Sequence, residues 1–145
     1  PYRLFYSMNE MGQISLEYLI VVAFVVFPVI VILGVSIFYT SSAQDQIKIS
    51  QLSAFANKIT GSAEAVYYAG EPSKVTITAY LPEGVQNVQV IADNLVVTMV
   101  ISSGATVLAF ESNVPLDNSA IFSLNGGLKR LVISAGADNV HITES

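Results

Sequence analysis

One carboxylate, that of Glu17, stands at the edge of the longest apolar stretch in the sequence. No other charged residue follows it until Asp45. A carboxylate at the edge of a membrane is costly unless it is paired, because its surroundings solvate it poorly. The chemistry that this position suggests is therefore an ion pair with a cation that comes from elsewhere.

Residues that carry out catalysis or bind cofactors are scarce in this sequence. The chain has no cysteine and one histidine, His141, which lies in a strand-like segment and is predicted to be a surface or edge residue. No serine elbow or phosphate-binding glycine loop is present. Asp93, Asp117 and Asp138 each precede an asparagine, which is typical of turns, and their spacing matches no calcium loop. We predict no catalytic residue, no cofactor, no metal site and no enzymatic activity.

Composition points to a membrane rather than to a nucleic acid. Six lysine and arginine residues oppose eleven aspartate and glutamate residues, and no basic run occurs, so nucleic acid is not a predicted partner. Hydrophobic residues make up 52% of the 145 residues and charged residues only 12%. Soluble domains are about a quarter charged. Much of the hydrophobic excess lies in one segment.

That segment, Leu19 to Phe38, contains 20 residues. As a helix it measures about 30 Å, the thickness of a bilayer core. It is longer than the apolar part of a secretory signal peptide, and no small-residue cleavage site follows it. Pro28 and Gly34 lie inside the run and are candidate kink positions; alternatively, a transmembrane helix simply tolerates them.

An amphipathic pattern follows the apolar run without an intervening proline. Its apolar residues recur at helical spacing, at Leu52, Phe55, Ala56, Ile59, Ala63 and Val66. The sequence therefore predicts one long helix from about Ile14 to Thr60. Gly61 is the predicted helix end, with a short helical continuation through Tyr68.

The rest of the chain alternates between apolar and polar residues in short segments with turn residues between them. We predict six or seven antiparallel strands, forming a twisted sheet or a small sandwich, with tight turns at Asp93–Asn94 and at 125–127. One face of this sheet should be covered by the helix stripe, which gives an α+β fold. The segments are 74–81, 87–92, 94–102, 103–112, 119–124, 129–136 and 139–145.

A short motif overlaps the start of the apolar run. Gln13, Ser15, Glu17 and Leu19 form the pattern Gln-x-Ser-x-Glu-x-Leu, and Gly12 precedes it. This pattern resembles the class III signal peptide of archaeal type IV pilin-like proteins. The motif is short, but its context of a short leader, an apolar run and a β-rich domain agrees with that family. The resemblance implies a pilin-like fold and a membrane-embedded prepilin peptidase that cuts before Gln13.

The resemblance also implies a division of the chain into four segments. These are a leader peptide (1–12), a transmembrane and filament-core helix (13–40), an amphipathic extension (41–68) and a β-rich surface domain (69–145). Cutting before Gln13 exposes an α-amino group. Glu17 is expected to pair with this amine during assembly; alternatively, it only caps the helix or faces lipid headgroups.

The expected function is a structural subunit, major or minor, of an archaeal type IV pilus-like filament, a class of filament that serves adhesion, motility or DNA uptake. The expected partners are further copies or other pilins, the prepilin peptidase, and the cell membrane before assembly. The precursor is expected in the membrane and the mature chain in an extracellular filament. The alternative is a single-pass, membrane-anchored extracytoplasmic binding domain that does not polymerise.

Overall fold

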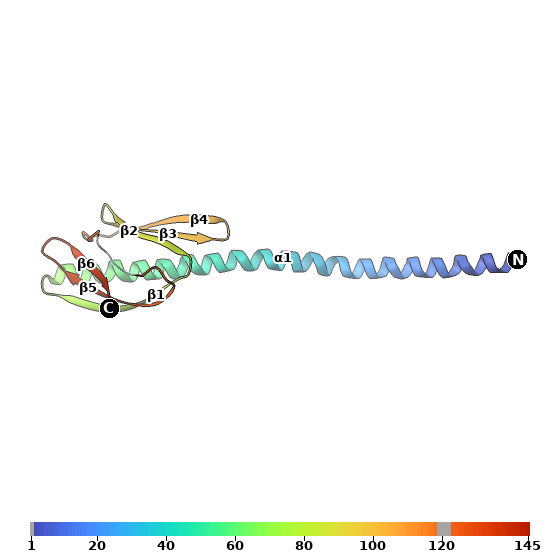
Figure 1. The fold of residues 1–145 in the computed structure, drawn as a ribbon, viewed down its shortest axis with the longest axis horizontal. Helices are drawn as coiled ribbons and strands as arrows, with labels where there is room; N and C mark the ends of the chain where they lie inside the picture. The colour runs from blue at the N-terminus through green and yellow to red at the C-terminus, as the bar shows by residue number, and fades with distance from the viewer. Residues whose placement is uncertain (1, 119–122) are drawn as a thin grey trace. The chain divides into compact units, whose positions relative to one another are not determined.

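The computed structural model describes the backbone of residues 2–118 and 123–145 and the side chains of residues 15–118 and 123–145. The fold is α+β, as predicted (Figure 1). The chain divides into an N-terminal unit, Pro1–Ser42, and a C-terminal unit, Ala43–Ser145. The elements are α1 (Tyr2–Ala69), β1 (Lys74–Leu81), β2 (Val85–Ile91), β3 (Asn94–Ile101), β4 (Gly104–Phe110), β5 (Gly127–Ala135) and β6 (Val140–Glu144).

Helix α1 begins at Tyr2 instead of about Ile14, and it is not interrupted at Gly61. It ends at Ala69, so the predicted helical continuation through Tyr68 is present. The helix end is instead formed at Gly70, which has a left-handed φ of 74° and donates its N–H to the Val66 carbonyl at 3.2 Å. The prediction at Gly61 is wrong because buried side chains beyond that glycine continue the packed stripe, and packing outweighs the low helix propensity of glycine.

The strands form two antiparallel three-stranded sheets, in the orders β1-β5-β6 and β2-β3-β4. Six of the predicted strands are present among the described residues. Of the predicted strand 119–124, residues 119–122 lie outside the described residues, and Ser123 and Leu124 are not in a strand. The turn predicted at Asp93–Asn94 lies one residue earlier, at Ala92–Asp93, because Asn94 already pairs with Ile91.

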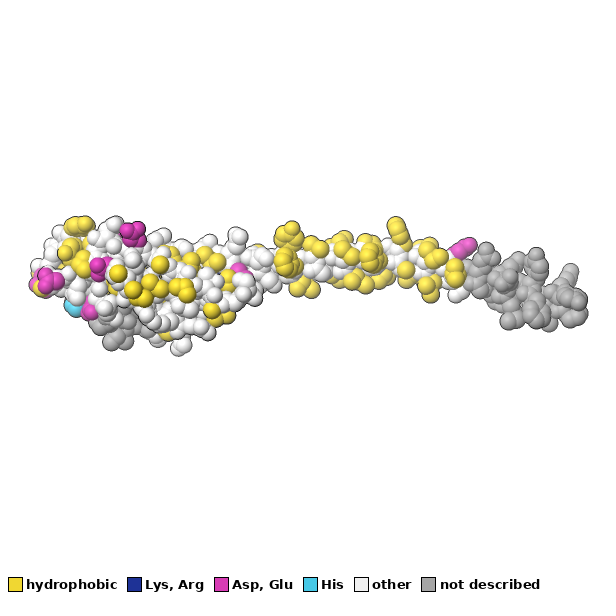
Figure 2. Space-filling view, turned by 90° about the horizontal axis from the view of Figure 1, so that it is seen from above, with side chains coloured by type: hydrophobic (Ala, Val, Ile, Leu, Met, Phe, Trp, Pro, Cys, Tyr) yellow, Lys and Arg dark blue, Asp and Glu magenta, His cyan; other side chains and the backbone are white. Residues whose placement is uncertain are grey.

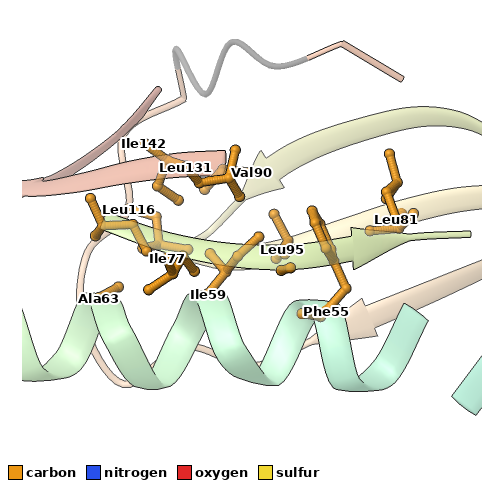
Figure 3. Packing of buried hydrophobic residues seen from close by; sticks show 14 of the residues in the cluster. Phe55, Ile59, Ala63, Ile77, Leu81, Val90, Leu95, Leu116, Leu131 and Ile142 are labelled. Carbon is orange, nitrogen blue, oxygen red and sulfur yellow. The ribbon is translucent and has the colours of Figure 1, made fainter. Parts of the chain in front are cut away.

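The core of the C-terminal unit lies between α1 and the two sheets. All six residues of the predicted helix stripe are buried, which confirms the predicted packing. Figure 3 shows Phe55, Ile59 and Ala63 reaching from α1 toward the strands. The buried partners from the sheets include Ile77, Leu81, Val90, Leu95, Met99, Leu131 and Ile142.

The turn between β2 and β3 contains two non-glycine residues with positive φ, Ala92 (φ 49°) and Asp93 (φ 64°). The left-handed conformation costs alanine about 1 kcal/mol, whereas asparagine adopts it readily. We expect Ala92→Asn to raise the free energy of unfolding by about 1 kcal/mol, measured by thermal unfolding of the chain in detergent. The same change at the exposed helical residue Ala65 should lower it by roughly 0.5 kcal/mol. Equal effects at the two positions would contradict the turn assignment.

Candidate functional site

The apolar run is exposed on every side in the N-terminal unit. Across Leu19–Phe38 the exposed fraction of the large apolar side chains ranges from 39% at Val22 to 82% at Phe24. Figure 2 shows hydrophobic side chains along this part of the helix. From Ser15 onward α1 is long and apolar enough to cross a membrane, and none of its most apolar part is buried. This helix is compatible with membrane anchoring.

Two exposed tyrosines, Tyr18 and Tyr39, mark the ends of the run. They are 21 positions apart in the sequence, or about 32 Å along a helix. Tyrosine is enriched at both membrane–water interfaces, because its ring is apolar and its hydroxyl is polar. The spacing of these two residues therefore fits the two faces of one bilayer, a signal that the sequence analysis did not use.

The motif residues lie at the start of the described side chains. Ser15, Glu17 and Leu19 are all exposed on α1. Ser15 and Leu19 are one turn apart on one side of the helix, and Glu17 points to the other side. Glu17 forms no ion pair with any side chain that the structure describes. Its carboxylate is thus available to a cation from outside this group of residues.

The processing site itself is only partly described. The Gln13 side chain lies outside the described residues, although the backbone of Gly12 and Gln13 is helical. The assignment of the cut to the bond between them remains a prediction from the motif.

Helix α1 continues through Pro28 and Gly34 without a break. Proline lacks an N–H, so the carbonyl of Phe24 loses its usual partner in the helix. A Cβ placed on Gly34 meets nothing within 4 Å, which leaves room for a close approach by another helix. A kink at either position remains a prediction.

Three side chains tie α1 to the rest of the C-terminal unit. The Asp45 carboxylate accepts the backbone N–H of Ser102, at 3.1 Å to Oδ1 and 3.2 Å to Oδ2, and the Ser102 hydroxyl donates to Oδ1 at 3.1 Å. These bonds fix the turn between β3 and β4 beside the helix. Further along α1, Lys58 donates to the Thr78 carbonyl at 2.6 Å, and Glu64 accepts from the Asn113 side chain at 2.7 Å.

A polar cluster joins β5, β6 and the segment before β5. Lys129 is buried, and its ammonium lies 3.3 Å from Glu144 Oε1 and donates to the Ser123 hydroxyl. Glu144 also accepts the backbone N–H of Ser123 at 2.6 Å. These backbone and hydroxyl hydrogen bonds from Ser123, followed by the nearby Lys129, lower the pKa of the Glu144 carboxyl below its usual value.

The lowered pKa of Glu144 makes the stability of the C-terminal unit depend on pH. A carboxyl whose pKa is lower in the folded than in the unfolded state contributes stability above the unfolded pKa, and that stability is lost as the pH falls through the folded pKa. We expect the melting temperature of the chain in detergent to fall as the pH drops below the ordinary value of 4.5. Glu144→Gln should reduce the drop in melting temperature between neutral and acidic pH, while Asp138→Asn should leave that drop unchanged. An unchanged drop in Glu144→Gln would contradict this role of Glu144.

His141 is an exposed residue of β6, as predicted, and its Nδ1 lies 2.6 Å from Asp117 Oδ2. The two residues are 24 positions apart, so the sequence alone did not pair them. Asp93 lies in the turn before β3 and Asp138 in the loop before β6. Among the described residues, no three metal-ligating side chains of the His, Cys, Asp and Glu types gather into a site.

The candidate functional region is therefore the exposed apolar helix with Glu17 at its edge. The C-terminal unit is a folded domain with a core of its own. No family model, curated protein or solved structure matches the chain.

Proposed function

We propose that this chain is a structural subunit of an archaeal type IV pilus-like surface filament, cut before Gln13 and assembled through α1. The observation that carries the proposal is an apolar helix, exposed on all sides, that begins within the pattern Gln13-x-Ser15-x-Glu17-x-Leu19. A membrane anchor alone accounts for the helix. It does not account for the motif at its edge.

Assembly in this proposal is an exchange of partners for the apolar helix. In the precursor, lipid surrounds Leu19–Phe38; in the filament, the same helices of neighbouring subunits do. The exchange requires no unfolding of the C-terminal unit, because the residues of its core come from that unit alone. The β-rich parts then form the filament surface.

Glu17 sets the position of one helix against the next. Removal of residues 1–12 leaves an α-amino group at Gln13, one helical turn from Glu17. Between apolar helices, where few water molecules screen the charges, a carboxylate and an amine attract each other strongly only at one register. The ion pair therefore fixes the two helices at that register.

The direct experiment is to produce the chain in an archaeal host, detach surface material and examine it by electron microscopy and N-terminal mass spectrometry. Filaments whose subunits begin at Gln13 are expected. Single molecules that stay in lipid with residues 1–12 attached would contradict the proposal and favour the membrane-anchored binding domain.

Processing is tested separately by a bulky side chain at the cut. We expect Gly12→Leu to lower the processed fraction by at least about tenfold, because the larger residue obstructs the bond in the peptidase site. The readout is the mass of the intact chain recovered from membranes. Met11→Leu, which introduces the same residue one position earlier, should be processed normally. Efficient cutting of Gly12→Leu, or a mature N-terminus other than Gln13, would refute the processing site.

A further inference from the structure

The two sheets of the C-terminal unit have four edge strands, and three of these edges are protected. Edge strands expose unpaired N–H and C=O groups, which pair readily with other chains unless something blocks them. On β1, Lys58 lies against the edge and donates to the Thr78 carbonyl at 2.6 Å. A lysine at this position covers the edge and places a charge there.

The edges of β6 and β2 are protected in other ways. The segment between β4 and β5 pairs with the start of β6, where the Val140 N–H donates to the Pro115 carbonyl at 2.9 Å and Leu116 forms a parallel bridge with Val140. The register of β2 shifts between Val85 and Asn87, and such a bulge disrupts a flat edge.

Strand β4 has none of these protections. Its sequence, Gly-Ala-Thr-Val-Leu-Ala-Phe, contains no charge and no proline, and it pairs with β3 in an unbroken register from Gly104 to Phe110. No described residue outside β3 hydrogen-bonds to its backbone. Figure 1 shows β4 at the margin of its sheet.

The pairing with β3 determines which backbone groups of β4 face outward. A two-residue turn, Ser102–Ser103, joins the strands, so its flanking residues Ile101 and Gly104 form a hydrogen-bonded pair. Such pairs alternate along an antiparallel ladder. The free N–H and C=O groups therefore belong to the residues that we call the outer strip: Ala105, Val107 and Ala109. Their side chains are exposed, with Val107 at 63%.

We propose that the outer strip binds the outer strip of a second copy of this chain, in an antiparallel pair centred on Val107. Val107 then lies opposite the partner's Val107, and Ala105 lies opposite the partner's Ala109. The three residues of each outer strip form hydrogen-bonded pairs with those of the other copy. In each strand, the larger Val107 side chain lies between the small side chains of Ala105 and Ala109. The result is one six-stranded sheet shared by two copies.

Charge favours this contact over others between two copies. The chain carries a net charge of −5, so most surfaces of two copies repel each other. The outer strip is uncharged. The nearest carboxylate in the sequence, Glu111, lies opposite the partner's Ser103 in this register, where a hydroxyl can donate to it, and not opposite another carboxylate.

This pairing rests on the proposed function for its biological meaning. The two-fold axis of an antiparallel strand pair is perpendicular to the strands, so elements that run along β4, as α1 of the C-terminal unit does in Figure 1, point in opposite directions in the two copies. The subunits of one helical filament all point the same way. The contact therefore joins subunits of two filaments that lie side by side. A single seven-residue edge pair buries less than the roughly 1,200 Å² of a stable interface, but repetition along a filament makes it strong. We infer that the filaments bundle through β4.

Cysteine cross-linking tests the pairing and its register, because the chain has no native cysteine. In Val107→Cys the two Cα atoms are expected about 5.5 Å apart, which suits a disulfide formed with an added oxidant. In Ala109→Cys the two thiols sit about 14 Å apart along the strands and cannot bond. We expect dimers on a non-reducing gel for Val107→Cys and none for Ala109→Cys. The double variant Ala105→Cys with Ala109→Cys should cross-link again. No cross-link, or equal cross-links in both single variants, would overturn the proposal.

Electron microscopy of filaments gives a second test. Val107→Pro removes an outward N–H without removing a hydrogen bond to β3, so we expect single filaments in normal amounts but no bundles. Val107→Thr, which keeps the N–H and the shape, should still bundle. Bundles that persist in Val107→Pro would overturn the pairing. A wild-type chain that forms no filaments would instead refute the proposed function, and cross-linking of the full chain concentrated in detergent would still decide the pairing.

Discussion

Replacing Glu17 with glutamine is expected to stop filament assembly while leaving a processed subunit in the membrane. Glutamine keeps the shape of the side chain but removes its charge, so the new amine at Gln13 is left without a partner between apolar helices. Removing one member of a buried ion pair costs about 3–5 kcal/mol, which corresponds to a roughly hundred- to several-thousandfold weaker contact. The measurement is filament mass per cell, with subunit in the membrane fraction as the reference.

The control for this experiment is Asp138→Asn, which removes the same charge from an exposed loop of the C-terminal unit. It should assemble normally. Glu17→Asp, which keeps the charge on a shorter side chain, should assemble better than Glu17→Gln. Normal filaments from Glu17→Gln would show that the carboxylate only caps the helix or faces headgroups.

Replacing Phe55 with alanine is expected to destabilise the C-terminal unit more than any surface change. Phe55 is 1% exposed and lies in the core between α1 and the sheets. Loss of a buried phenylalanine costs about 3–5 kcal/mol, a large part of the 5–15 kcal/mol that holds a typical domain folded. We expect the melting temperature in detergent to fall by about 12 °C or more.

Phe24→Ala provides the matched control, since it makes the same substitution at a residue that is 82% exposed. It should leave the melting temperature of the C-terminal unit unchanged, because Phe24 belongs to the other unit. Similar losses in both variants would show that the two units unfold together.

The packing of the helix against the sheets could be predicted because apolar residues recur at the spacing of an α-helix. Leu52, Ile59 and Ala63 share one helix face, and all three are buried, as their spacing predicted. Most strands were recognised because apolar residues alternate within them and turn residues separate them. The local sequence pattern was sufficient to predict a helix or a strand where one face of that element is buried.

Long-range contacts could not be predicted, because nothing local encodes them. The Asp45–Ser102 contact joins residues 57 positions apart, and the Lys129–Glu144 pair forms only after β5 and β6 are placed side by side. Likewise, Gly61 looks like a helix end until the packing on both sides of it is known. The tertiary structure determines the contacts of these side chains and the place where the helix ends.

The candidate site was more predictable than the fold around it. Its components, an apolar run with a carboxylate at its edge, are consecutive in the sequence, and the structure finds both exposed. The binding partner of Glu17 could not be predicted, because in the proposed function it depends on a second molecule and on an amine that forms only when the chain is cut. Neither is a property of one folded chain.

The three ties of α1 at Asp45, Lys58 and Glu64 have a mechanical consequence. They are spread over 20 residues, about 28 Å along the helix axis, and most of the buried stripe lies between them. A force along the axis of this segment loads all three ties and the stripe in parallel, so they must rupture together instead of one after another. The C-terminal unit should therefore resist traction along α1 far better than a force that peels a single strand away.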